Sequence, residues 1–173
     1  MSVNRRADQE VVELMPGITA RILANRSTGS EMLTIMEATM ESGAAIPYHR
    51  HANADETLFV VEGDAEMLVD GHRFNTGPND TVLAPRGLGH AVRNIGDTPL
   101  KFIAIFPIPD REIEPLDLPS EIIDGRIPSA TFRAEAEPIE IRPGVLRYEM
   151  VGDFVGAEST YLSELVFSPE GWT

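Results

Sequence analysis

Histidine and glutamate residues at short spacings are the groups in this sequence best suited to chemistry. His49 and His51 are two residues apart, so on a β-strand both imidazoles would leave from the same face. Glu56 lies five residues after His51, an odd number, and on an unbroken strand it would face away. The small polar stretch 52–55 can turn or bulge, which resets the alternation and lets Glu56 converge with the histidines. His90 opens a later strand-like stretch and is available as a fourth ligand.

Three imidazoles and one carboxylate make a mixed nitrogen and oxygen donor set. Such a set suits iron, manganese, nickel, cobalt or zinc, and does not suit calcium or magnesium. The sequence contains no cysteine, which excludes disulfides, thiolate ligands and thiol nucleophiles. No Ser-His-Asp set or phosphate-binding loop is visible, so a metal would have to do the chemistry.

The elements that must position these residues are short strands separated by turns. Runs rich in Val, Ile, Leu, Phe and Thr alternate with Gly, Pro, Asn and Asp, which is typical of an antiparallel sandwich or barrel. Asp70-Gly71 predicts a tight hairpin, because both residues tolerate a positive φ. The sequence therefore indicates an all-β fold. The expected strands are 57–61, 65–69, 73–76, 81–83, 89–94 and 100–106.

Residues 35–106 resemble the cupin superfamily. Its first motif, G-x5-H-x-H-x4-E-x6-G, is matched at Gly43, His49, His51, Glu56 and Gly63. Its second motif, G-x5-P-x-G-x2-H-x3-N, is met by Pro85, Gly87, His90 and Asn94. Asn79 stands in place of the leading glycine, a mild departure because Asn tolerates a left-handed turn. The resemblance implies a double-stranded β-helix, or jelly-roll barrel, with a substrate mouth at one end.

The resemblance also implies that His49, His51, Glu56 and His90 hold one divalent metal ion inside the barrel. Without a metal, burying these groups would cost roughly 2–7 kcal/mol for each one that lacks a partner. Glu56 is predicted to be catalytic, as a proton acceptor that loosens from the metal, by resemblance to cupin dioxygenases. Alternation in phase with the ligands predicts a substrate-binding wall. Its members are Leu58, Val60, Met67, Val92 and Phe102.

Two classes of function fit such a site. The first is a metal-dependent enzyme acting on a small organic molecule, with dioxygenase-like chemistry favoured over isomerase, lyase or decarboxylase steps. The second is a metal-containing module that binds a small ligand without turnover. The sequence shows no fused DNA-binding segment, which argues against a ligand-sensing regulator.

The chain divides into three parts. Residues 1–112 are expected to form the barrel with the metal site, and 113–128 a Pro-rich linker or arm with one short helical turn near 120–123. Residues 129–173 are expected to form a C-terminal β extension that resembles the start of a second cupin unit. Pro16-Gly17 repeats at Pro143-Gly144, an offset of 127 residues. The alternative is that Pro-Gly turns between strands look alike.

The repeated segment predicts an interface. A second unit that stops at Gly171-Trp172-Thr173 ends before it could supply its own histidines, and its few strands cannot close a barrel alone. Unpaired strand edges must be covered, so a homodimer is expected, with this segment in or near the interface.

The charge and hydropathy of the chain limit which classes of partner it can have. The net charge is -14, from 28 acidic and 14 basic residues, and such a field repels nucleic acid and anionic membranes. No apolar run suits a signal peptide or a membrane span, so a cytoplasmic location is expected. The expected partner of the metal site is a small-molecule substrate. His72, Arg50 and Tyr48 are assigned to the surface, and Asn94 to a turn.

Overall fold

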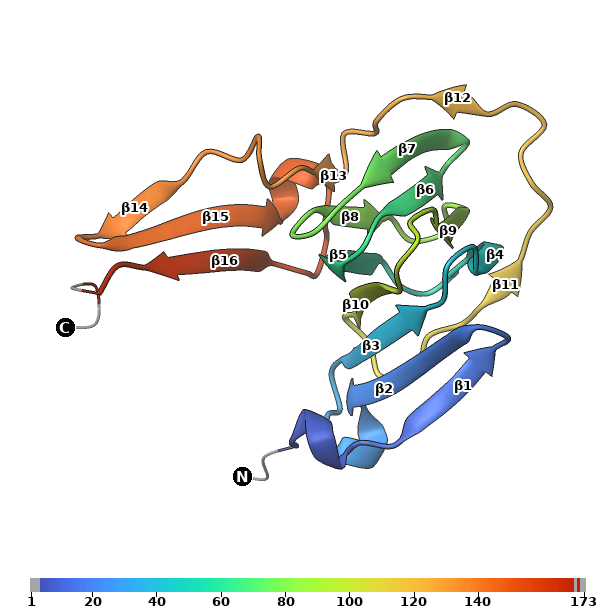
Figure 1. Cartoon of the computed structure of the whole chain (residues 1–173), viewed down its shortest axis with the longest axis horizontal. Coiled ribbons are helices and arrows are strands. Elements are labelled where there is room, and N and C mark those ends of the chain that lie inside the picture. The colour runs from blue at the N-terminus through green and yellow to red at the C-terminus, as the bar shows by residue number, and fades with distance from the viewer. Residues whose placement is uncertain (1–3, 170, 172–173) are drawn as a thin grey trace.

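The computed structural model describes residues 4–169 and 171, and nearly all regular structure in them is β-strand, as predicted (Figure 1). The strands up to residue 106 are β1 (Val11–Met15), β2 (Ile18–Ala24), β3 (Thr34–Met40), β4 (Ala45–Arg50), β5 (Glu56–Glu62), β6 (Ala65–Val69), β7 (His72–Thr76), β8 (Thr81–Ala84), β9 (His90–Asn94) and β10 (Leu100–Phe106). The later strands are β11 (Glu114–Pro115), β12 (Ile123–Asp124), β13 (Ala130–Thr131), β14 (Ile139–Arg142), β15 (Val145–Val151) and β16 (Leu162–Phe167). Short 3-10 turns lie at η1 (Arg6–Asp8), η2 (Arg26–Thr28) and η3 (Asp153–Val155). None of these helical turns is long and apolar enough to cross a membrane.

Two sheets face each other and enclose the core. In the described residues their strand orders are β1-β2-β3-β10-β5-β8-β13 and β11-β4-β9-β6-β7-β12. Leu58 and Phe102 from the first sheet pack with Met67 and Val92 from the second, each with an exposed fraction of 2% or less. Full burial of such a side chain contributes about 1.5–3 kcal/mol. Along β10 every second residue is buried, which is the alternation expected of a strand with one face on the core.

Tight turns join the strands where the sequence predicts them. At the β6–β7 hairpin Asp70 has φ 48° and Gly71 has φ 79°, so both central residues take the left-handed conformation. Asn79, which replaces the motif glycine, also has a positive φ, of 71°. The buried Asn94 donates to the carbonyls of Met40 (3.0 Å) and Thr98 (2.8 Å), so it fixes the turn after β9 as predicted.

The segment after β10 is the stretch that the sequence predicts to be a Pro-rich linker or arm. It runs along the outside of the barrel, where β11 pairs with β4 and β12 pairs in parallel with β7 (Figure 1). The helical turn predicted at 120–123 is absent, because the Ile123 N–H donates to the carbonyl of Gly71 (2.9 Å) and extends the second sheet. An exposed strand edge offers backbone partners that a single helical turn lacks. The boundaries at 112 and 128 stay predictions.

The strands of the C-terminal segment have the same order and spacing as the first three strands. Each of β14, β15, η3 and β16 falls 127 residues after β1, β2, η2 and β3 to within one residue, and Gly17 and Gly144 share a φ of 74°. These three strands form a separate sheet to one side of the barrel (Figure 1). That the segment begins a second cupin unit stays a prediction, and its last residues, Trp172 and Thr173, lie outside the described residues.

A matched pair of glycine substitutions tests the turn that closes β5. Gly63 and Gly43 have φ values of 87° and 76°, so alanine at either costs about 1–2 kcal/mol of left-handed strain. A Cβ on Gly63 would also lie 2.9 Å from the Leu100 Cα, whereas a Cβ on Gly43 meets nothing within 4 Å. We expect Gly63→Ala to lower the free energy of urea unfolding clearly more than Gly43→Ala. Equal losses would show that the backbone contact with β10 does not constrain this turn.

Candidate metal centre

Four side chains from both sheets converge on one point inside the barrel. One potential ligand atom from each of His49, His51, Glu56 and His90 lies within 4.8 Å of the others. His49 on β4 pairs in register with His90, the first residue of β9. His51 follows the end of β4, and Glu56 opens β5 in the facing sheet. The chain between β4 and β5 is not a strand, and this break in the small polar stretch 52–55 lets Glu56 face the histidines.

Hydrogen bonds between the two ligand-bearing loops keep this arrangement together. The Gly87 N–H donates to the carbonyl of His51 (2.8 Å), and the Arg86 N–H donates to the buried carboxylate of Asp55 (2.8 Å). The turn that precedes His90 is therefore tied to the loop that precedes Glu56. Both loops lie at the same end of the barrel.

Each of the three imidazoles has one nitrogen committed to a backbone carbonyl. The Nδ1 atoms of His49, His51 and His90 lie 2.8, 2.5 and 3.1 Å from the carbonyl oxygens of Pro47, Glu112 and Leu88. A carbonyl oxygen can only accept a hydrogen bond, so each Nδ1 carries the proton. In the neutral rings, the Nε2 lone pairs are therefore free to bind a metal ion.

The carboxylate of Glu56 needs a cation beside it. Its Oε2 lies 3.0 Å from Nε2 of His51 and 2.8 Å from Nε2 of His90, although both sides are acceptors when the rings are neutral and the acid is ionised. Either a proton on a ring or a metal ion must separate them. Ligand nitrogens and oxygens bind zinc at about 2.0–2.2 Å, so two donors on one ion lie roughly 3–4 Å apart. The spacing and chemistry of the four residues fit a divalent transition metal.

The pKa shifts of these side chains show the same demand for positive charge. Burial raises the pKa of Glu56, but hydrogen bonds to His51 and His90 outweigh it and hold that pKa far below its usual range. Burial lowers the pKa of His90, and the hydrogen bond to Glu56 more than compensates, so its pKa is raised. Burial and the neighbouring His90 lower the pKa of His49. Glu56 is therefore an ionised ligand at neutral pH.

A cavity of about 390 Å³ adjoins the four ligands, and its wall is mostly apolar. Of the predicted substrate-binding residues, Val92 lies on this wall. The other four lie in the hydrophobic core and do not line this cavity, so their role in substrate binding stays a prediction. They are Leu58, Val60, Met67 and Phe102. Alternation predicts which face of the sheet a side chain occupies, but not how far along the barrel axis it lies.

The prediction of cavity-lining residues, based on their spacing from the ligands, did not include the residues that distant segments contribute. The first three strands contribute Leu14, Ile18 and Met36, and the segment after β10 contributes Arg111. Tyr48 lines the cavity as well, rather than lying on the surface as predicted, since the register of β4 shifts between Ile46 and His49. No local sequence pattern predicts these contacts, because they depend on how the first three strands and the segment after β10 pack over the barrel.

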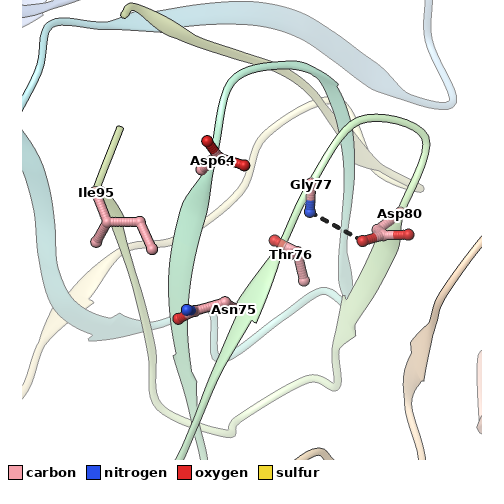
Figure 2. A pocket seen from close by; sticks show the side chains of 6 residues that line it. All are labelled: Asp64, Asn75, Thr76, Gly77, Asp80 and Ile95. Atoms are coloured by element: carbon pink, nitrogen blue, oxygen red, sulfur yellow. Dashed lines mark hydrogen bonds between the residues drawn. The ribbon is translucent and has the colours of Figure 1, made fainter. Parts of the chain in front are cut away.

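The opposite end of the barrel carries a second hollow, bordered by Asp64, Thr76 and Ile95 (Figure 2). Its polar groups serve turns: the N–H groups of Gly77 and Arg133 each donate to the carboxylate of Asp80 at 2.9 Å. Within residues 4–169 and 171, the metal-ligand cluster is at the other end. That end is therefore the candidate site.

Comparison with known proteins identifies the barrel. A model of the cupin domain matches residues 36–106, the stretch that holds all four ligand residues. The chain belongs to the cupin superfamily. The solved structure of the polyketide cyclase RemF from Streptomyces resistomycificus matches this cupin with a TM-score of 0.60 at 21% identity, over 70% of this chain and 89% of that one. The likeness shows the fold, the jelly-roll barrel that the motifs predict.

Two bacterial enzymes are similar to this cupin in sequence. Oxalate decarboxylase from Bacillus subtilis (strain 168) is 35% identical over 107 residues, which are 59% of this chain and 28% of that protein. Quercetin 2,3-dioxygenase from the same organism is 33% identical over 75 residues, 43% of this chain and 22% of that protein. The similarity spans less than a third of either enzyme.

Histidine substitutions test the metal centre. His49→Ala or His90→Ala removes one of the four donors that would hold the metal ion. We expect metal affinity to fall at least ~100-fold, beyond the roughly 10–100-fold typical of losing a group that only orients a ligand. Metal analysis of protein purified without chelators, followed by titration with Mn²⁺ and Zn²⁺, measures this.

His72→Ala is the matched control, because His72 lies outside the cluster. It should keep the wild-type metal content. A wild-type protein that holds no metal and takes up neither ion would overturn the assignment.

Proposed function

We propose that this cupin is a metal-dependent enzyme that acts on a small organic molecule. The observation that carries the proposal is the convergence of three imidazoles and one ionised carboxylate beside an apolar cavity. A divalent ion held there would act as a Lewis acid that polarises an oxygen of the substrate. Four protein ligands leave room on a six-coordinate ion for that oxygen.

Residues of the chain supply the remaining steps. Glu56 would hold the ion from the sheet opposite His49 and His90, so movement of this one side chain would free a carboxylate to accept a proton. The carbonyl of Glu112 holds His51 by its Nδ1, so its Nε2 would be oriented to bind the ion. The apolar wall excludes water and accepts the body of the substrate.

Two reaction types have support. Dioxygenase-like cleavage is our first candidate, and similarity to quercetin 2,3-dioxygenase supports it. Similarity to oxalate decarboxylase supports decarboxylation as the second. An ion held by four protein ligands would have room for a substrate oxygen in either reaction, and dioxygen would be the second substrate of the first.

Substrate turnover distinguishes these reactions from simple binding. We expect metal-loaded protein, incubated with a panel of catechols, flavonols and keto acids, to consume dioxygen or to release carbon dioxide with at least one member. The His49→Ala protein should fall to the rate of buffer with the same metal. An oxygen electrode and a carbon dioxide assay measure the two outcomes. Binding of a panel member without either product would favour the alternative, a non-catalytic binding module.

We also propose that the chain forms a homodimer through the sheet of β14, β15 and β16. In the barrel, β3 pairs with β2 on one side and with β10 on the other. The corresponding strand of the C-terminal sheet, β16, pairs with β15 on one side and, in the described residues, with no strand on the other. Leu165 and Val166 on that strand are 44% and 40% exposed. Edges with exposed apolar side chains readily pair with another strand, and a second copy supplies one.

A charged residue on the β16 edge tests the dimer. Leu165→Lys should convert a wild-type dimer to a monomer in light scattering, because an edge lysine blocks strand pairing. Met32→Lys is the control, since Met32 is 77% exposed on a loop outside this sheet. A dimer that persists in Leu165→Lys would place the interface elsewhere.

A further inference from the structure

Arg111 is the charged residue, apart from the metal ligands, that lines the cavity of the metal centre. Most of the remaining wall is apolar, as at Leu14, Met36 and Ile113. Apolar walls give contact area, while the few polar groups among them orient the ligand and decide which ligand fits. A guanidinium offers five N–H donors in a planar fork and no acceptor, so it selects for an anion.

The backbone on both sides of Arg111 is fixed to the ligand-bearing loop. Asn53 donates through its Nδ2 to the carbonyl of Asp110 (3.1 Å) and accepts the Glu112 N–H on its Oδ1 (2.9 Å). The carbonyl of Glu112 in turn accepts from His51 (2.5 Å). Arg111 therefore has its place set by the same loop that delivers His51 and Glu56.

Arg111 lacks the acidic partner that its neighbours have. Arg26 pairs with Asp110 at 2.7 Å and Arg50 with Glu114 at 2.6 Å, so both arginines that flank this segment are neutralised. Among the described residues Arg111 forms no ion pair, in a chain with 28 acidic residues, and its guanidinium lies 4.7 Å from the centroid of the Phe106 ring. A positive charge inside the cavity is thus available to a ligand.

The Phe106 ring also fixes how far this charge is from the metal centre. His51 packs edge-on against the same ring, with 5.0 Å between centroids. The guanidinium and the His51 ring are therefore separated by no more than about 10 Å. One small organic molecule can span that distance.

We propose that Arg111 is the anion-binding residue of this cavity and that the substrate is a small organic acid with an apolar body. Its carboxylate pairs with the Arg111 guanidinium in the two-pronged geometry that the planar fork favours, while a second oxygen faces the four metal ligands. The inference rests on the proposed function, since it assigns the substrate class of the same site. It adds a specificity-determining residue that neither cupin motif contains.

Binding of an isosteric pair of probes tests the role of Arg111. Phenylacetate and phenylacetamide differ in charge and little in shape. Calorimetry with the Zn²⁺-loaded protein and with the chelator-treated protein measures both, which separates an ion pair with Arg111 from direct binding to the metal. We expect the preference for phenylacetate to persist without metal and to fall about 10–100-fold in Arg111→Gln, as for loss of a hydrogen bond to a charged group. Arg111→Lys should keep part of it.

Arg73→Gln is the matched control, because it removes one positive charge from β7, away from the cavity, and it should leave the preference unchanged. Metal content should be unchanged in every Arg111 variant. In the wild type, phenylacetate should also shift the Nε–H signal of Arg111 in a ¹H–¹⁵N spectrum, a readout that does not depend on how well a variant folds.

The inference and the proposed function can fail separately. A wild-type protein that binds no metal, yet prefers phenylacetate through Arg111, would sink the proposed function and keep the anion site. A metal-loaded wild type without any preference for phenylacetate, or an Arg111→Gln protein with the wild-type preference, would show that Arg111 only packs on Phe106.

Discussion

The carboxylate of Glu56 is the electrostatic centre of this structure. It is enclosed between two sheets, and the imidazole nitrogens that face it cannot donate a hydrogen bond to it while the rings are neutral. Each ring donates its Nδ1–H to a backbone carbonyl. Three Nε2 lone pairs and the negative charge of Glu56 therefore surround one point. Such a point is stable only with a cation. A metal ion satisfies all four groups at once, whereas a proton can serve one nitrogen and one oxygen at a time.

Meeting that constraint requires several separate segments to agree in position. The three carbonyls belong to β4, to the turn before β9 and to the segment after β10, and the carboxylate comes from the facing sheet. Hydrogen bonds between the loops around His51 and Arg86 hold the two motif segments together. Small errors in any of them would move a donor by more than a metal–ligand bond tolerates. Much of the barrel around this end therefore serves to keep the four donors in register.

The two ends of the barrel differ in what their loops do: at one end they close turns, and at the other they line a cavity. At one end, turns consume their own polar groups, as Asp80 does with Gly77 and Arg133. At the other end, β1 to β3 and the segment after β10 build an apolar wall, and that segment carries Arg111 among paired arginines. A strongly acidic chain repels anions at long range. The unpaired guanidinium of Arg111 within the cavity is a local exception, because it attracts an anionic ligand.

The sequence by itself determined the strands between residues 57 and 106, the turns that join them and the four candidate ligands. These depend on local alternation, on residues that tolerate a positive φ and on the spacing of the two motifs. Tertiary structure alone decided depth along the barrel, and so it assigned Leu58, Val60, Met67 and Phe102 to the core and brought Leu14, Met36 and Arg111 to the cavity. It also decided that short strands of the expected linker or arm pair with the barrel. The physical reason is that periodicity fixes the direction of a side chain relative to its own strand, whereas a cavity wall depends on which distant segments lie across from that strand.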